Sequence, residues 1–225
     1  MADQPHTPDA ITPDCRPINP DRPEPPPPLG DVAEPDGDIW FFAYGSLMWD
    51  RGQIPHTAAL PARLWGYHRA LCIMSYFYRG TEAQPGLVLG LDRGGSTRGI
   101  AFRIAAQGKA QVMADLKARE TSVNEYHLRW LRVRIETDAS DGEKKASRKV
   151  IAGAYVINRD GRHYAGKLSF DDKVRMVAQG HGDRGACLDY LCNTVAHLQE
   201  MGIKERELER VLAGFVYDPE PPNVY

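Results

Sequence analysis

A series of strand-like segments over residues 39–157 is the feature that most limits how this chain can fold. Each segment is a short run of β-branched, aromatic and aliphatic residues, and turn-forming residues separate it from the next. One helical pattern, at 107–121, interrupts the series, and further helices follow only from Ser169. This order is an α+β pattern and lacks the regular alternation of βαβ units. We expect strands at 39–44, 63–75, 86–91, 98–105, 127–136 and 149–157.

The C-terminal third has the periodicity of helices. Ser169 is a suitable N-cap, and Asp171 and Asp172 follow it in the first turn, where negative charge is favourable. Apolar residues recur at helical spacing over 186–201, and a last helix fits 204–216. The glycines of QGHGDRG, before the 186–201 helix, predict either a plain connection or a loop that covers substrate. The charged stretch TDASDGEKKASR, between the last two strands, predicts a solvated hairpin extension.

The N-terminal segment differs from the rest in composition. Eleven of the 17 prolines fall within residues 1–35, and residues 1–38 carry nine Asp or Glu against two Arg. The net charge of the whole chain is −2, so the first 38 residues carry −7 and the remainder carries +5. We expect a disordered, Pro-rich, acidic tail over 1–36, followed by one folded domain over 37–225. The tail is either passive or a polyproline II ligand for an aromatic-lined partner domain.

Composition also excludes several classes of protein. No apolar run approaches the roughly 20 residues that a membrane-spanning helix needs, and the N-terminus has no secretory-signal pattern. The four cysteines and seven histidines form no zinc-binding pattern, and clustered basic and aromatic residues typical of nucleic-acid binding are absent. We therefore expect a cytoplasmic protein with free thiols, no metal, and neither a nucleic-acid nor a membrane partner. The oligomeric state cannot be read from the sequence.

One strand ends abruptly in a small, hydroxyl-bearing turn. The apolar run Trp40–Ala43 stops at Tyr44-Gly45-Ser46. Two interpretations are open at this point. Either the chain only needs to turn here, or the exposed backbone N–H groups of the turn hold a carboxylate or phosphate.

Glu120 is placed unusually for a charged residue. At about 100° per residue it falls about 80° from Val112 around the helix, between Leu116 and Met113, and so lies on the apolar face. Desolvation and the negative end of the helix dipole would both raise its pKa toward that of a useful acid/base. The alternatives are a buried ion pair with an arginine such as Arg119, or a helix that ends before residue 120.

Taken together, the chain resembles the ChaC-like γ-glutamylcyclotransferases, the glutathione-specific branch of their superfamily. The resemblance covers about residues 39–215. The motifs that carry it, in the order of the family, are YGSLMW (44–49), GYHRALCIMS (66–75), YRGTEAQPGLVLGL (78–91), GIAFRI (99–104) and ARE (118–120), followed by Tyr126 and by Tyr190-Leu191. Three positions depart from the family: Tyr78 replaces a histidine, TSVNEY replaces a glycine-containing stretch, and Cys187 stands near a family asparagine.

The resemblance implies a mixed β-barrel flanked by helices, with the YGSL turn at its mouth. It implies cyclisation of glutathione to 5-oxoproline with release of Cys-Gly, a small-molecule reaction that needs no cofactor or metal. Glu120 would be the catalytic acid/base. Backbone N–H groups of Gly45, Ser46 and Leu47 would anchor the substrate carboxylate, with the hydroxyls of Tyr44 and Tyr126 nearby and Arg79 at the glycine carboxylate. The alternatives are a core tyrosine for Tyr126 and a surface arginine for Arg79.

Other functions remain open on this scaffold. One is a cyclotransferase for other γ-glutamyl amino acids or for γ-glutamylamines, which would share the same proximal chemistry. Another is a non-catalytic regulatory protein that binds a γ-glutamyl ligand. A hydrolase with Ser46 as nucleophile is disfavoured because the turn lacks the G-x-S-x-G elbow.

Overall fold

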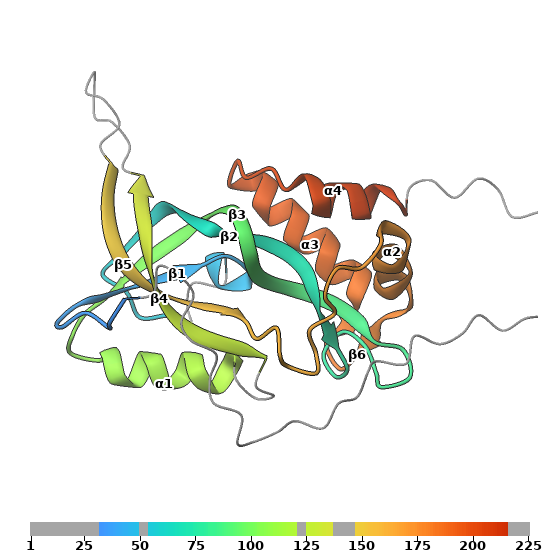
Figure 1. Cartoon of the computed structure of the whole chain (residues 1–225), viewed down its shortest axis with the longest axis horizontal. Coiled ribbons are helices and arrows are strands. Elements are labelled where there is room, and N and C mark those ends of the chain that lie inside the picture. The colour runs from blue at the N-terminus through green and yellow to red at the C-terminus, as the bar shows by residue number, and fades with distance from the viewer. Residues whose placement is uncertain (1–31, 50–53, 121–124, 137–146, 216–225) are drawn as a thin grey trace, which may run out of the picture.

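The computed structural model describes residues 32–49, 54–120, 125–136 and 147–215, except for the side chain of Glu120. Five strands close into a barrel in the order β1-β3-β2-β4-β5 (Figure 1). They are β1 (Ile39–Ala43), β2 (Ala58–Ser75), β3 (Gly86–Ile104), β4 (Tyr126–Glu136) and β5 (Ser147–Ile157). β1 and β5 pair in parallel, whereas the other neighbours are antiparallel, so the mixed barrel expected for the family is confirmed.

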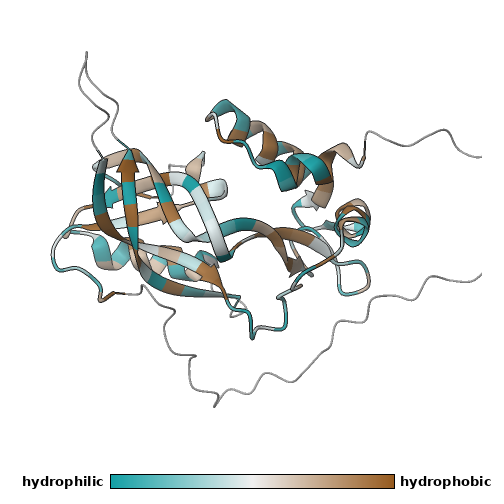
Figure 2. Cartoon of the chain, turned by 45° about the horizontal axis from the view of Figure 1, so that its top comes forward, coloured by the Kyte–Doolittle hydropathy of each residue, from teal (hydrophilic) through white to brown (hydrophobic). Residues whose placement is uncertain are grey.

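Two apolar clusters follow from the alternation of side chains along the strands. One takes residues from all five strands and none from a helix, so it fills the barrel interior; Trp40, Phe42 and Leu64 belong to it. The other joins the opposite face of β1, including Phe41, to the helices. Figure 2 shows hydrophobic and hydrophilic residues side by side along the barrel strands and along the helices, as expected where each element has one buried face.

The helices cover the barrel from two sides. α1 (Lys109–Glu120) lies along one side of the barrel, and α2 (Phe170–Gln179), α3 (Cys187–Glu200) and α4 (Arg206–Ala213) gather beside the far ends of β2 and β3 (Figure 1). A short 3₁₀ helix, η1 (Ser46–Met48), follows β1 directly. A two-stranded ribbon of β6 (His181–Gly182) and β7 (Gly185–Ala186) precedes α3.

The sequence-based boundaries hold for most elements. α1 buries Val112 and Leu116 as expected, and its helix runs to residue 120, so a helix ending before that residue is excluded. Ser169 caps α2, because its Oγ accepts a hydrogen bond of 3.1 Å from the N–H of Asp172. Residues 137–146, predicted as a hairpin extension, lie outside the described residues.

The largest difference concerns β3, which the sequence predicts as two strands, at 86–91 and 98–105. The structure has one strand of 19 residues. Gly94 and Gly95 adopt φ values of 102° and 67°, and Gly66 in the facing β2 has a φ of 85°. These positive φ values bend both strands at one place, where the register shifts between Trp65 and Tyr67, and the ladder continues beyond the bend.

The N-terminal end of the described chain contacts the barrel. The N–H of Val32 donates to the carbonyl oxygen of Trp130 at 2.9 Å, and Glu34 pairs with Lys109 on α1 at 3.0 Å. The predicted boundary after residue 36 therefore falls within a segment that touches the barrel, and the tail prediction for residues 1–31 lies outside the described residues. Among the described helices, none has the length and apolar character to cross a membrane.

A close backbone approach between β3 and β1 gives a test of the fold. A Cβ at Gly99 would overlap the carbonyl oxygen of Ala43 and lie 2.9 Å from Cζ of Phe42. We expect Gly99→Ala to lower the free energy of unfolding by about 3 kcal/mol or more, as measured by urea denaturation. Gly45→Ala is the matched control, because a Cβ there meets nothing within 4 Å. Equal stability of the two variants would show that β1 does not lie this close to β3.

Candidate active site

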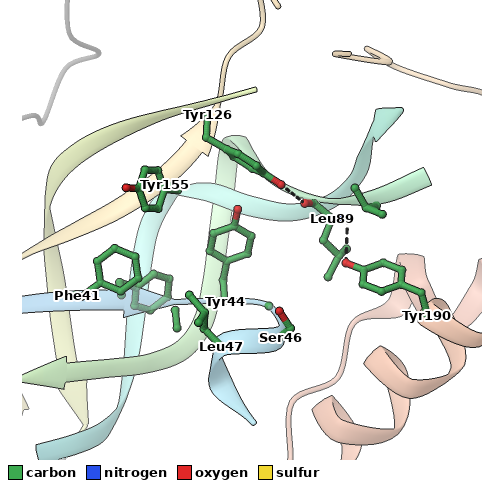
Figure 3. A pocket seen from close by; sticks show the side chains of 12 residues that line it. Phe41, Tyr44, Ser46, Leu47, Leu89, Tyr126, Tyr155 and Tyr190 are labelled. Carbon is green, nitrogen blue, oxygen red and sulfur yellow. Dashed lines mark hydrogen bonds between the residues drawn. The ribbon is translucent and has the colours of Figure 1, made fainter. Parts of the chain in front are cut away.

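A cavity of about 100 Å³ lies at the carboxyl end of β1. Its walls come from β1 and the turn that follows, from β3, from β4 and β5, and from α3 (Figure 3). The lining residues are Phe41, Phe42, Ala43, Tyr44, Gly45, Ser46, Leu47, Val88, Leu89, Tyr126, Tyr155 and Tyr190. The structure thus brings five of the seven predicted site residues, Tyr44 to Leu47 and Tyr126, to one cavity.

The turn after β1 presents unsatisfied backbone donors. Hydrogen bonds of η1 run from the N–H of Met48 to the carbonyl of Gly45 (2.9 Å) and from the N–H of Trp49 to that of Ser46 (3.2 Å). The N–H groups of Gly45, Ser46 and Leu47 donate to no group within the part of the chain that the structure describes. Such orphan donors at the start of a helical turn are suited to an anionic oxygen.

The last turn of α1 meets this turn directly. Nη2 of Arg119 donates to Oγ of Ser46 at 2.8 Å, so residues separated by 73 positions in sequence are in contact. A guanidinium at this place adds positive charge next to the unsatisfied N–H groups. The side chain of Glu120 lies outside the described residues, so its role as acid/base stays a prediction. The backbone of Glu120 is nevertheless adjacent to a residue that contacts the predicted substrate turn.

Two tyrosine hydroxyls hold the backbone of Leu89 at the cavity wall (Figure 3). The hydroxyl of Tyr126 donates to the carbonyl of Leu89 at 3.2 Å, and the N–H of Leu89 donates to the hydroxyl oxygen of Tyr190 at 3.1 Å. Burial raises the pKa of Tyr190 to about 12, so this hydroxyl stays protonated at neutral pH. Because the proton of Tyr126 is directed to Leu89, its oxygen can serve a ligand as an acceptor.

Arg79 does not line the cavity but lies behind Tyr190. Its guanidinium carbon is 5.5 Å from the centroid of the Tyr190 ring. Nη1 donates to the carbonyls of Arg184 and Ala186, the latter at 3.2 Å. Nε and Nη2 have no hydrogen-bond partner among the described residues and remain as donors. The contact of Arg79 with a glycine carboxylate stays a prediction.

Glycines let two turns pack closely beside Arg79. The N–H groups of Asp183 and Arg184 donate to the carbonyls of Phe77 and Tyr78 at 2.9 and 3.0 Å. A Cβ at Gly182 would overlap the carbonyl of Phe77. The QGHGDRG glycines therefore join the β6–β7 ribbon to the β2–β3 turn by direct backbone contact, as a packed connection between α2 and α3.

Two tyrosines that line the cavity were not predicted from the sequence as site residues. Tyr155 lies in β5 and packs edge-on against Phe41, with ring centroids 5.9 Å apart. Its signal in the sequence was weak, since the only distinction of Tyr155 is that it is the one aromatic residue of β5. Tyr190 had a stronger signal, because it belongs to the Tyr-Leu pair that supports the family resemblance. Among the described residues, no three His, Cys, Asp or Glu side chains come together as a set of metal ligands.

Comparison with known proteins decides the family. The model of the ChaC-like protein family matches residues 39–215. This chain belongs to the ChaC-like family. The glutathione-specific gamma-glutamylcyclotransferase of Escherichia coli (strain K12) is 30% identical over 184 residues, which cover 80% of this chain and 74% of that protein. The human glutathione-specific gamma-glutamylcyclotransferase 1 is 27% identical over 191 residues, covering 83% of this chain and 82% of that protein.

A solved structure has the same fold. The crystal structure of the yeast gamma-glutamyl cyclotransferase specific to glutathione matches with a TM-score of 0.68 at 23% sequence identity. The match covers 79% of this chain and 95% of that one.

One departure from the family pattern has a structural explanation. Cys187, at the position near the family asparagine, begins α3 and is fully buried. Its thiol donates to the carbonyl of Leu87 at 3.0 Å, and its sulfur accepts from the N–H of Leu87 at 3.2 Å. An asparagine amide likewise offers both a donor, its NH2 group, and an acceptor, its carbonyl oxygen. The thiol therefore satisfies both backbone groups of the strand that forms the cavity wall.

We predict that this thiol is unreactive in the folded protein. Burial raises the pKa of Cys187 to about 11 and that of Cys72 to about 12, whereas Cys192 is exposed. Alkylation by iodoacetamide at about pH 8, followed by peptide mass spectrometry, should modify Cys192 and spare the other two, because only the thiolate reacts. In urea all three should react. Modification of native Cys187 at the rate of Cys192 would contradict its placement.

Proposed function

We propose that this chain is a glutathione-specific γ-glutamylcyclotransferase, which converts glutathione to 5-oxoproline and Cys-Gly. One observation supports this most directly: three unsatisfied N–H groups, at Gly45 to Leu47, line a cavity whose turn is hydrogen-bonded to the last turn of α1. That arrangement puts a candidate anion site beside the helix that ends in Glu120. The curated relatives from Escherichia coli and human carry the name of this activity.

The γ-glutamyl half of the substrate would bind at the turn after β1. Its α-carboxylate would accept hydrogen bonds from the N–H groups of Gly45, Ser46 and Leu47, and Arg119 would add a favourable positive charge. Charge-assisted hydrogen bonds of this kind are stronger than neutral ones. The oxygen of Tyr126 can accept a hydrogen bond from the α-ammonium group. These contacts would fix the end of the substrate that becomes the ring.

The reaction moves two protons from the substrate α-ammonium group to the amine of Cys-Gly. The substrate α-amine is largely protonated near neutral pH, so Glu120, as carboxylate, first accepts a proton from it. The free amine attacks the γ-carbonyl carbon, a new C–N bond closes the five-membered ring, and the bond to the cysteine nitrogen breaks. Glu120 then gives this proton to the departing nitrogen of Cys-Gly. The attacking nitrogen loses its second proton to the same carboxylate, so the ring keeps one N–H and Cys-Gly leaves with a protonated amine. Holding the chain folded back for attack can lower the barrier by several kcal/mol.

The Cys-Gly half would extend from the cavity toward Arg79. The unpaired Nε and Nη2 of Arg79 are suitable donors for the glycine carboxylate, and stacking on Tyr190 holds the guanidinium beside the cavity. Because Tyr78 and Cys187 differ from the family pattern in this region, other γ-glutamyl amino acids or γ-glutamylamines remain the alternative substrates. A panel of γ-glutamyl compounds, assayed for 5-oxoproline release, would distinguish them.

We further propose that the protein works in the reducing cytoplasm. The thiols of Cys72, Cys187 and Cys192 are free in the structure, which is compatible with that setting.

The function and the acid/base are tested together by adding glutathione to the purified protein. We expect the wild type to release equimolar 5-oxoproline and Cys-Gly, measured by mass spectrometry. Glu120→Gln preserves size but removes the base, so kcat should fall by about a thousandfold or more while glutathione affinity changes little. Circular dichroism of both proteins controls for folding. Wild-type rates in the variant would exclude Glu120, and no product from the wild type would refute the proposed function.

Gly45 gives a second test, at the turn itself. Its φ of −124° lies outside the left-handed region, and an added Cβ would meet nothing within 4 Å, so the protein itself does not require glycine here. We expect Gly45→Ala to fold normally and to raise the KM for glutathione about tenfold or more, because the methyl group would occupy space needed by the substrate. Steady-state kinetics measures this. An unchanged KM would mean that the substrate does not approach this backbone.

A further inference from the structure

A buried arginine stands directly behind the turn that lines the cavity. Arg69, in β2, has a side chain with no exposed surface. Its Nε donates to the carbonyl oxygen of Tyr44 at 2.6 Å, and Nη2 donates to the carbonyl oxygen of Arg98 and lies 3.9 Å from Sδ of Met48. Nη1 pairs with Glu205. One guanidinium therefore joins the end of β1, β3, the 3₁₀ turn and the start of α4.

Arg69 acts where the β1–β3 ladder stops. The last paired residues are Ala43 and Ile100, and the next positions along each strand are Tyr44 and Gly99. Beyond this point the carbonyls of Tyr44 and Arg98 accept hydrogen bonds from the guanidinium of Arg69. Buried carbonyls need such partners, so Arg69 allows β1 to leave the sheet at Tyr44 without a loss of hydrogen bonding.

The hydrogen bond to Tyr44 also fixes a donor of the candidate anion site. The described peptide bonds are all trans, so the carbonyl of Tyr44 and the N–H of Gly45 belong to one rigid plane and point in opposite directions. With the carbonyl held by Arg69, the N–H of Gly45 is directed away from Arg69, which does not line the cavity. A rotation of this peptide would misalign the first of the three unsatisfied N–H groups.

Glu205 holds the guanidinium from the far side. It is the N-cap residue of α4, yet its side chain makes no capping hydrogen bond and pairs with Arg69 instead. Burial lowers the pKa of Arg69, and the charge of Glu205 opposes that effect. α4 is thereby tied to the site without contributing a residue to the cavity.

We propose that Arg69, held by Glu205, is a positioning residue for substrate binding: it sets the orientation of the Tyr44–Gly45 peptide and so the geometry of the N–H groups that receive the α-carboxylate. This inference rests on the proposed function for the identity of the ligand. It assigns no contact between Arg69 and substrate.

The test compares Arg69→Lys with Arg103→Lys in glutathione kinetics. Lysine keeps the charge but cannot reach the Tyr44 carbonyl, the Arg98 carbonyl and Glu205 together. We expect the KM of Arg69→Lys to rise about tenfold, with a kcat within about threefold of wild type. The reason is that anchoring of the carboxylate stabilises the ground state and the transition state alike. Arg103, on β3, makes a half-exposed ion pair with Asp38. Arg103→Lys should therefore keep the kcat and KM of the wild type. A purely structural role would lower the stability of Arg69→Lys and leave the KM of its folded fraction unchanged, which would overturn the inference.

Hydrogen–deuterium exchange tests whether Arg69 orders the turn after β1 without any measurement of activity. Without substrate, the amides of 44–49 should exchange faster in Arg69→Lys than in wild type, whereas those of β4 should not change; equal exchange at 44–49 would also overturn the inference.

If Arg69→Lys fails to fold, Glu205→Ala and Glu205→Gln replace it. The alanine variant should raise the KM about threefold, and the glutamine variant, which keeps the acceptor oxygen, should not. Equal KM values would refute the role. A wild type without turnover would refute the proposed function alone.

Discussion

The site depends on how β1 ends. A strand inside a closed barrel has its N–H and carbonyl groups paired on both sides, and a chain that leaves the barrel must find new partners for them. Here the carbonyl of Tyr44 is taken over by Arg69, whereas the following N–H groups of Gly45, Ser46 and Leu47 have no partner among the described residues. The departure of the chain from the barrel at Tyr44 thus leaves a set of unpaired N–H donors at the cavity wall.

Close backbone packing makes this ending possible. Gly99 lies where any side chain would overlap the Ala43 carbonyl, so β3 can stay against the end of β1 while the chain turns. Farther along β3, Gly86 packs in the same way against the carbonyl of Arg79 and against Cys187. The cavity wall at Val88 and Leu89 is held between these two contacts. Glycines on one strand thereby fix both ends of the wall that the tyrosines complete.

Much of this could be predicted from the sequence, for identifiable reasons. The apolar run before Tyr44 and the helical face that includes Val112 and Leu116 are local patterns, and the structure confirms both elements. The division of β3 was wrong, because a glycine pair predicts a break unless its partner strand has a matching glycine. Only the position of Gly66 in β2, at the register shift facing the glycine pair, shows that the strand bends and continues, and such a long-range relation is absent from a local pattern.

The arginines show a second limit of sequence reasoning. Arg69 lies within a predicted strand, where an isolated cation predicts a solvent-facing position, yet it is buried because three separate segments supply acceptors. Arg119 was considered from the sequence only as an alternative ion-pair partner of Glu120, and its contact with Ser46, 73 positions away, could not be read from a local pattern.

Family membership gives the least information about the part of the proposed site that would hold the Cys-Gly half of the substrate. The contacts proposed at the turn after β1 and at the end of α1 would suit any γ-glutamyl substrate, because each substrate of that class presents the same carboxylate, amine and carbonyl. Discrimination among them must come from contacts beyond the scissile bond. In the proposed binding mode this region would be Arg79, which stacks on Tyr190, together with the packed turns at Tyr78 and Gly182. A charged terminal carboxylate is the substrate feature that an arginine with two unpaired donors would select, and γ-glutamylamines lack it. The arrangement around Arg79 therefore favours glutathione or another γ-glutamyl peptide over an amine.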